Sequence, residues 1–277
     1  MFGLAILFGG LVGFALGLTG GGGGVFAVPL LVYGLAVAPR TAVGISLASV
    51  GGTALFGVIP RLLRGDVELR TGLLFAVAGM IGAPVGSYLS TLVPENLLLV
   101  MFGLLMLVVA WRMWAKARDP QLPTGVCVTE GIAPMDDVDR SACQRDADGQ
   151  LRLTSRCARL LVVVGLVTGV LSGLFGVGGG FVIVPALVLF SGMEIHRAVG
   201  TSLLVIVLIS ISGVASHLLA GKEFSSELTL QFLAGGLVGM WLGGIVSTKL
   251  KGPTLQKVFA IAVVLVAMFV IGKSIIS

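Results

Sequence analysis

Backbone amides, rather than ionised side chains, are the groups in this sequence best placed to do chemistry. Five consecutive glycines, residues 20–24, interrupt the apolar stretch GLTGGGGGVFAVP at 17–29, and GLFGVGGGFVIVP at 173–185 repeats the pattern. Glycine costs about 1 kcal/mol relative to alanine in a helix interior, so neither stretch is expected to be one continuous helix. A glycine turn that leads into a helix presents unshielded N–H groups and a positive dipole end, which together suit an anion.

Hydroxyl side chains follow each glycine stretch in a second shared element, AVGISL at 42–47 and AVGTSL at 198–203. A hydroxyl can donate to an oxyanion without bringing a charge of its own. Helix packing is the competing interpretation, both for the hydroxyls and for the glycines, which let helices approach closely. The predicted substrate-binding residues are Gly20, Gly21, Gly22, Gly23, Gly24, Gly176, Gly178, Gly179, Gly180, Ser46, Ser49, Thr201 and Ser202.

Membrane-spanning helices must position these groups. The 277-residue chain is 56% hydrophobic and 11% charged, with a mean hydropathy of +1.09. Its solid apolar blocks are long enough to cross about 30 Å of hydrocarbon, whereas a transmembrane β-barrel would alternate polar and apolar residues. The sequence therefore predicts an all-α polytopic membrane protein. Its net charge of +5 is interpreted as orientation in the membrane rather than affinity for nucleic acid.

An internal duplication organises the chain. A shift of 156 residues lays 13–47 on 169–203, and 16 of the 35 aligned pairs are identical. Duplication of one unit is common in transporters. The predicted organisation is a first transmembrane repeat at 1–114, a linker at 115–157 and a second transmembrane repeat at 158–277. A shift of 157 then aligns Gly79, Gly82 and Gly86 with Gly236, Gly239 and Gly243.

Each repeat contains five apolar segments, of which the first two are short. A short pair joined by glycines fits a broken or re-entrant helical hairpin whose tip lies within the membrane. Pro29 and Pro185 are expected at or near the first turn of the second short helix, where a missing N–H is tolerated. The expected segments are roughly 2–18, 25–38, 41–59, 71–92 and 96–114, then 158–175, 181–192, 197–220, 228–248 and 254–272.

Basic residues in equivalent loops predict how the two repeats face. The loop after the third segment carries three arginines, at 61, 64 and 70, in the first repeat but only Lys222 in the second. The loop after the fourth segment carries no Lys or Arg in the first repeat but three lysines, at 249, 251 and 257, in the second. Because short cytoplasmic loops are enriched in Lys and Arg, the repeats are predicted to be inverted, with a cytoplasmic linker. A parallel repeat, with the first two segments fused into one broken helix, is the alternative.

The paired glycine stretches, with AVGISL and AVGTSL downstream, resemble the TauE/SafE family of sulfite exporters, membrane proteins of bacteria and archaea. The resemblance covers nearly the whole chain except the linker. It implies a multi-pass transporter of the plasma membrane whose substrate is sulfite or a related sulfur-containing oxyanion or organosulfonate. No catalytic cluster of acids, His or Cys is visible near the apolar segments, so no enzymatic activity, cofactor or metal is expected.

The expected mechanism follows from the absence of Asp and Glu within the segment cores, because proton-coupled pumps commonly use such carboxylates. Moving a dianion outward across a membrane that is about 100 mV negative inside releases roughly 4.6 kcal/mol, twice the single-charge value. We expect export driven by this potential and the anion gradient, through alternating access around a site near the bilayer midplane. A passive anion channel and an importer are the alternatives, and a homo-oligomer is compatible with the sequence.

The remaining polar residues are expected to have mainly structural roles. Arg40, His196 and Arg197 stand at the mouths of the third segments, where anchoring at lipid headgroups is favoured over drawing anions toward the pore. His217 is expected to face the surface or to be hydrogen-bonded rather than to carry protons. The three cysteines lack C-x2-C spacing and would lie in a reducing compartment, so free thiols are expected at Cys127, Cys143 and Cys157.

Overall fold

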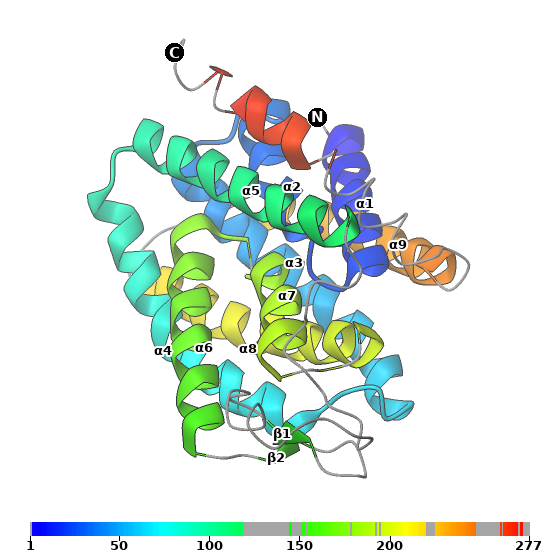
Figure 1. The fold of residues 1–277 in the computed structure, drawn as a ribbon. Coiled ribbons are helices and arrows are strands. Elements are labelled where there is room, and N and C mark those ends of the chain that lie inside the picture. Colours follow the sequence, from blue (N-terminus) through cyan, green and yellow to red (C-terminus); the bar gives the residue numbers. More distant parts are fainter. Residues whose placement is uncertain are drawn as a thin grey trace.

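Long apolar runs form helices throughout the computed structural model (Figure 1). Within the part of the chain that it describes, five helices are long and apolar enough to cross a membrane, at Pro39–Leu63, Leu69–Leu92, Cys157–Phe175, His196–Leu219 and Ser226–Val246. The predicted all-α membrane class is therefore confirmed. The structure describes residues 2–118, 144–145, 151–152, 155–177, 179–191, 193, 195–219, 225–247, 261, 263–270 and 272–273.

The helices begin and end close to the expected segments. In the first half they are α1 (Phe2–Thr19), α2 (Gly24–Pro29), the π-helix η1 (Leu30–Gly34), α3 (Pro39–Leu63), α4 (Leu69–Leu92) and α5 (Glu95–Arg118). In the second half they are α6 (Ser155–Phe175), α7 (Gly180–Ser191), α8 (Ile195–Leu219) and α9 (Ser226–Ser247). Residues 263–270 are also helical, and two short antiparallel strands lie between the halves, β1 (Gln144–Arg145) and β2 (Leu151–Arg152).

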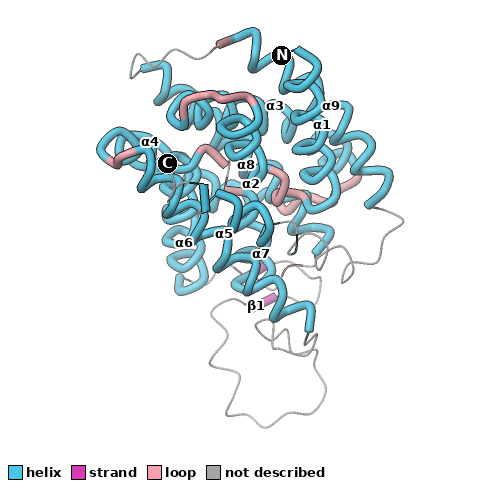
Figure 2. The backbone as a smooth tube through the Cα atoms, turned by 90° about the horizontal axis from the view of Figure 1, so that it is seen from above, coloured by secondary structure: helices cyan, strands magenta, loops and turns pink. Residues whose placement is uncertain are grey.

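Two glycine seams join each half of the chain to the other. Helix α1 lies beside α9, and α6 lies beside α4, in both views (Figures 1 and 2). A Cβ atom added to Gly13 of α1 would lie 2.7 Å from the Cα of Gly236 in α9. At the equivalent positions, a Cβ added to Gly169 of α6 would lie 2.6 Å from the Cα of Gly79 in α4. The same backbone contact is therefore made twice, and each time it joins a helix of the first half to a helix of the second half.

Two pairs of glycines spaced by four residues also serve this packing, Gly82 with Gly86 in α4 and Gly239 with Gly243 in α9. A Cβ on Gly82 would lie 2.9 Å from the backbone nitrogen of Val170, and one on Gly243 would lie 3.1 Å from the Cα of Phe14. Small residues spaced by four let helix backbones approach closely in a membrane, where hydrophobic burial does not drive helix association. For these glycines the packing interpretation is confirmed.

Helices α3 and α8 cross at the centre of the bundle, between the two seams (Figure 1). A Cβ added to Gly57 would lie 3.3 Å from Leu203 Cδ1, and one added to Gly213 would lie 3.2 Å from Leu47 Cδ1. The C-terminal half of α3 thus meets the N-terminal half of α8, and the N-terminal half of α3 meets the C-terminal half of α8. These two equivalent helices therefore run antiparallel.

The prolines lie deeper in their helices than expected. Pro29 is the sixth residue of α2 and Pro185 the sixth residue of α7, one turn beyond the helix start. A proline at this depth has no N–H to donate to the carbonyl four residues earlier. After Pro29 the chain continues as the π-helix η1, a geometry that accommodates such a local interruption of the hydrogen-bond ladder.

Replacing Gly86 with valine is expected to destabilise the fold by about 1–3 kcal/mol, the usual cost of overpacking. The new Cβ would overlap the carbonyl oxygen of Val170 and lie 2.8 Å from the backbone nitrogen of Leu174. Gly244→Val is the matched control, since a Cβ there meets nothing within 4 Å. Thermal unfolding in detergent should show a lower midpoint for Gly86→Val only; equal midpoints for the two variants would contradict the seam.

Candidate functional site

The turn after α1 is closed by hydrogen bonds of its own residues. Gly20 adopts a left-handed backbone conformation, with φ of +74°, and its N–H donates to the carbonyl of Leu16 at 2.7 Å. A residue without a Cβ adopts this conformation at no steric cost, which explains glycine at the end of α1. The hydroxyl of Thr19 accepts a hydrogen bond from the N–H of Gly22 at 2.9 Å, so the amide of Gly22 is already satisfied.

The turn after α6 repeats this geometry. Gly176, equivalent to Gly20, has φ of +70°, and its N–H donates to the carbonyl of Ser172 at 2.8 Å. Gly179 is also left-handed, with φ of +68°, and its carbonyl accepts from the N–H of Ile183 in the first turn of α7. The predicted site residue Gly178 lies outside the residues that the structure describes.

The two glycine turns touch each other inside the bundle. A Cβ added to Gly21 would lie 2.6 Å from the carbonyl carbon of Gly180, and one added to Gly180 would lie 2.6 Å from the Cα of Gly21. Both residues are buried. The turns therefore leave no room for a solute between Gly21 and Gly180, and an anion can enter there only if the turns separate.

Each turn also rests on the third helix of the other half. A Cβ on Gly20 would lie 2.9 Å from the Cα of Val199 in α8, and one on Gly176 would lie 2.5 Å from the Cα of Val43 in α3. Val43 and Val199 are equivalent residues of the AVGISL and AVGTSL elements. Each glycine turn therefore packs against the shared AVGISL or AVGTSL element of the opposite half.

Ser202 and Ser46 occupy equivalent positions but differ in hydrogen bonding. Ser202 Oγ lies 2.7 Å from the carbonyl oxygen of Gly20 and 2.8 Å from that of Val199, so its single proton serves these two acceptors. Ser46 is fully buried, and its Oγ has no hydrogen-bond partner in the part of the chain that the structure describes. One hydroxyl is therefore attached to a glycine turn, while its counterpart on α3 keeps an unused donor in the interior.

The other two predicted hydroxyl residues are directed elsewhere. Ser49 Oγ lies 3.4 Å from the carbonyl oxygen of Thr229 in α9. Thr201 Oγ1 accepts a hydrogen bond of 2.9 Å from the N–H of Glu68, just before α4 begins. Successive residues of a helix point about 100° apart, so Thr201 faces α4 while its neighbour Ser202 faces the glycine turn.

Replacing Ser202 with alanine is expected to lower the free energy of unfolding by about 1 kcal/mol, because the carbonyl of Gly20 loses a buried hydrogen bond. Ser46→Ala, its matched control, should leave stability almost unchanged, since the Ser46 hydroxyl has no partner to lose. Thermal unfolding of both variants in detergent measures the difference. Equal shifts for the two variants would show that the asymmetry between the serines is not real.

A family model matches almost the whole chain. The matching model is that of the sulfite exporter TauE/SafE, and it covers residues 5–270. The chain belongs to the TauE/SafE family. It is 36% identical to a probable membrane transporter protein of Xylella fastidiosa (strain Temecula1), over 96% of this chain and 93% of that protein. It is 28% identical to the probable membrane transporter protein YunE of Bacillus subtilis (strain 168), over 98% of this chain and 96% of that protein. No solved structure matches the chain.

Membership of the TauE/SafE family makes this chain a membrane transporter, and transport is not an enzymatic activity. Its helices agree with that class, because five of those described can cross a membrane. Within the described residues there is no group of three or more His, Cys, Asp or Glu that could hold a metal ion.

The basic and imidazole side chains of this TauE/SafE protein take structural positions where the structure shows their contacts. Arg40 donates from Nη2 to the carbonyl of Thr91 at 3.2 Å, at the last turn of α4. Arg40 is exposed, and its expected anchoring at lipid headgroups stays a prediction. His217 is buried, and its Nδ1 lies 3.0 Å from Ser87 Oγ, which confirms the expected hydrogen bond. His196 and Arg197 are exposed at the start of α8.

Cys157 corrects the expectation of free thiols. It is buried in the first turn of α6 and is disulfide-bonded. The other two cysteines of this expectation, Cys127 and Cys143, lie outside the described residues. Spacing along the sequence cannot reveal such a bond, because it depends on which cysteines the folded chain brings together.

Thr19 is a functional candidate that the sequence reasoning missed. Its hydroxyl accepts from Gly22 and also donates to the carbonyl of Ala15 at 2.7 Å, so it fixes the first glycine turn to the end of α1. Its position directly before the five glycines could have predicted this role, since Thr hydroxyls commonly form hydrogen bonds with the backbone of nearby turns. The aligned residue of the second half is Phe175, which makes no such bond and instead packs against Phe102.

Proposed function

We propose that this TauE/SafE protein exports sulfite or a related sulfur-containing oxyanion across the plasma membrane and binds it with the backbone of its two glycine turns. The observation that carries the proposal is the meeting of the turns, Gly21 against Gly180, in the buried centre of the bundle. The family's description as sulfite exporters supports sulfur in the substrate. The glycine turns support an anion, for the electrostatic reason that follows.

Free amides at the first turn supply the attraction for an anion. Among the described residues, the N–H groups of Gly21, Gly23 and Gly24 donate no hydrogen bond. An unpartnered N–H in a membrane interior costs several kcal/mol, and an oxyanion that accepts from it removes this cost. Helices α2 and α7 both begin at a turn, so their positive dipole ends add to the attraction. Ser46, with its unused buried hydroxyl, is the further donor that we assign to the site.

Inverted repeats explain how two such turns reach one point. Helices α3 and α8 run antiparallel, and the seams α1–α9 and α6–α4 make the same contacts at equivalent positions, as a two-fold relation requires. In an inverted arrangement the α1–α2 hairpin enters from one side of the membrane and the α6–α7 hairpin from the other. Their tips then lie near the midplane, where non-helical backbone is tolerated because it is buried in protein.

Charge assigns the two sides of this arrangement. Helices α4 and α8 run parallel, since Glu68 contacts Thr201 near their starts and Ser87 contacts His217 near their ends. The end at which they begin carries four arginines, in the last turn of α3, in the loop after it, and in the first turns of α4 and α8: Arg61, Arg64, Arg70 and Arg197. By the positive-inside rule this end faces the cytoplasm, and the linker that enters α6 lies on the same side.

The closed contact between the turns supports an alternating-access mechanism. Each hairpin packs along a helix of the other repeat, so α1 moves with α9 and α6 moves with α4 when one unit rocks against the other. Separation of Gly21 from Gly180 opens the site toward one side. In the closed arrangement the Ser202 hydroxyl holds the first turn, and the unused Ser46 hydroxyl can donate to the anion once the turns separate.

Anion efflux from proteoliposomes tests this function. Vesicles containing the purified protein should release labelled sulfite at a rate that saturates with concentration, and sulfate, thiosulfate, sulfoacetate and chloride should be compared as competitors. Saturable release with preference for a sulfur-containing anion supports the proposal. Unsaturable release with no preference over chloride would instead identify a passive anion channel.

A further inference from the structure

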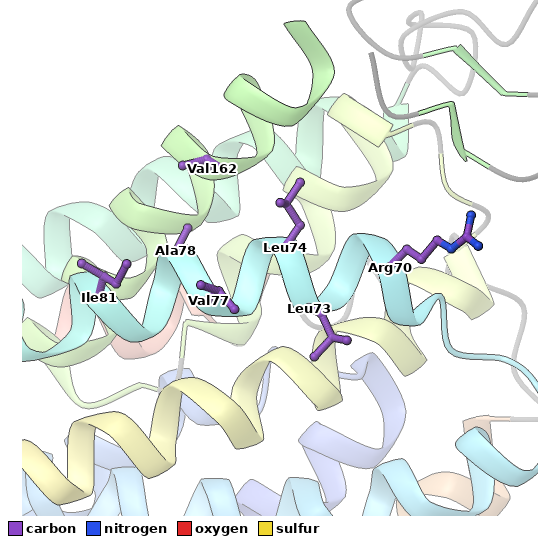
Figure 3. A pocket seen from close by; sticks show the side chains of 7 residues that line it. All are labelled: Arg70, Leu73, Leu74, Val77, Ala78, Ile81 and Val162. Atoms are coloured by element: carbon purple, nitrogen blue, oxygen red, sulfur yellow. The ribbon is translucent and has the colours of Figure 1, made fainter. Parts of the chain in front are cut away.

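An apolar groove runs along the outer surface of α4 and α6, apart from the glycine turns (Figure 3). Its volume is about 470 Å³. One face of α4 supplies most of the lining at spacings of three and four residues, and α6 supplies one side chain. Among the described residues the lining side chains are Arg70, Leu73, Leu74, Val77, Ala78, Ile81 and Val162. Apart from Arg70, every lining side chain is apolar.

The groove has the length of one lipid chain within one leaflet. From Arg70 to Ile81 the helix rises roughly 16 Å at about 1.5 Å per residue, close to half of the ~30 Å hydrocarbon core. Val77 and Ile81 are 55% and 61% exposed, whereas Ala78 beneath them is 4% exposed. Ala78 thus forms the floor of the groove, which an acyl chain can fill.

Arg70 places a positive charge at one end of this groove. Figure 3 shows its side chain extending away from the apolar side chains, at the start of α4. Arg70 is exposed and, within the described residues, makes no hydrogen bond or ion pair. A guanidinium binds phosphate oxygens through paired, charge-assisted hydrogen bonds. An unpaired cation at the end of an apolar groove is complementary to a phosphate that is attached to an acyl chain.

The second repeat lacks this combination. The residue equivalent to Arg70 is Glu227, and the residue equivalent to Leu74 is Gln231. Gln231 Nε2 donates to Glu227 Oε1 at 3.3 Å, so this position holds a negative, partnered group that would repel phosphate. The charge complementarity is therefore confined to the end of the bundle that carries the basic loops.

We propose that the groove between α4 and α6 binds one anionic phospholipid, with its phosphate on Arg70 and an acyl chain along Leu73, Val77 and Ile81. The site is separate from the glycine turns and does not depend on what the protein transports. It places a bound lipid against α4, one of the two helices of the α4–α6 seam.

Native mass spectrometry of the detergent-solubilised protein with added phosphatidylglycerol tests the phosphate contact. Arg70→Gln should weaken phosphatidylglycerol binding about fivefold, the effect of one basic residue near a lipid surface. Arg64→Gln is the matched control, because Arg64 is exposed in the same loop but does not line the groove. Equal losses in the two variants, or no loss in Arg70→Gln, would overturn the site.

A second pair of variants tests the groove itself. Val77→Trp fills the groove and should reduce retained lipid, whereas Val85→Trp, at a 52% exposed position on the same helix outside the groove, should not. Equal retention in these two variants would overturn the acyl-chain assignment. So would a dimer whose crosslinks run through cysteines placed at Ile81 and Val162, because a second copy would then cover the groove.

Discussion

Replacing Gly21 with alanine is expected to reduce anion transport at least tenfold while the protein still inserts and purifies. The new methyl group would lie 2.6 Å from the carbonyl carbon of Gly180 and would overlap its oxygen, so the two turns could not close on each other. Overlap of this kind typically costs about 1–3 kcal/mol, and here it falls on the contact that we propose forms and breaks during transport. Sulfite efflux from proteoliposomes, normalised to the reconstituted protein, measures the effect.

Gly180→Ala should give the same defect from the other side of the contact, because its Cβ would lie 2.6 Å from the Cα of Gly21. Gly3→Ala is the matched control, since that position in α1 has nothing within 4 Å. Transport at the wild-type rate in both turn variants would remove the glycine turns from the transport pathway. A defect in Gly3→Ala of similar size would attribute the loss to helix α1 in general.

Sulfite efflux is expected to accelerate when the vesicle interior is made negative. For a dianion, about 100 mV corresponds to roughly 4.6 kcal/mol, which is about three orders of magnitude in the equilibrium ratio of the anion. The physical reason is that the proposed site would hold the charge with amides, which carry no compensating ion. A potassium gradient with valinomycin sets the potential, and a separately imposed pH gradient tests the alternative of proton coupling.

The described helices support this independence from protons. Asp and Glu occur in them only within the first two residues of a helix, at Glu95 and Glu227, so none lies in the middle of a span. His217 is the buried titratable side chain to test, and His217→Asn keeps a polar group beside Ser87. The variant should retain the voltage response. Efflux that follows the pH gradient, ignores the potential and is lost in His217→Asn would establish proton coupling instead.

Local features of the fold could be predicted because they depend on short-range composition. The apolar runs at 71–92 and 158–175 became α4 (Leu69–Leu92) and α6 (Ser155–Phe175), within a few residues. Breaks in the helices were also predictable, since glycine and helix continuity conflict wherever glycines cluster. The left-handed conformations at Gly20 and Gly176 repeat because the sequence repeats there.

Other features depended on orientation and distance that no local pattern encodes. The two sides of one helix separate Thr201 from Ser202, so these two of the four predicted hydroxyl residues bond to different elements. Ser46 and Ser202 are identical in the alignment but differ in hydrogen bonding, because the two halves are not in identical surroundings. The disulfide at Cys157 likewise depends on a long-range approach of the chain to itself.

The sequence by itself determined that this protein is a helical membrane protein, that it is built from two copies of one unit, and that glycines interrupt both copies at the same place. These properties follow from hydrophobic length, repetition and backbone sterics, all of which act locally. Only the tertiary structure decided that the two turns touch, that each rests on a helix of the other half, and that glycine seams cross between the halves. Those contacts join residues more than 80 positions apart, and they form because glycine lets backbones meet where any side chain would hold them apart.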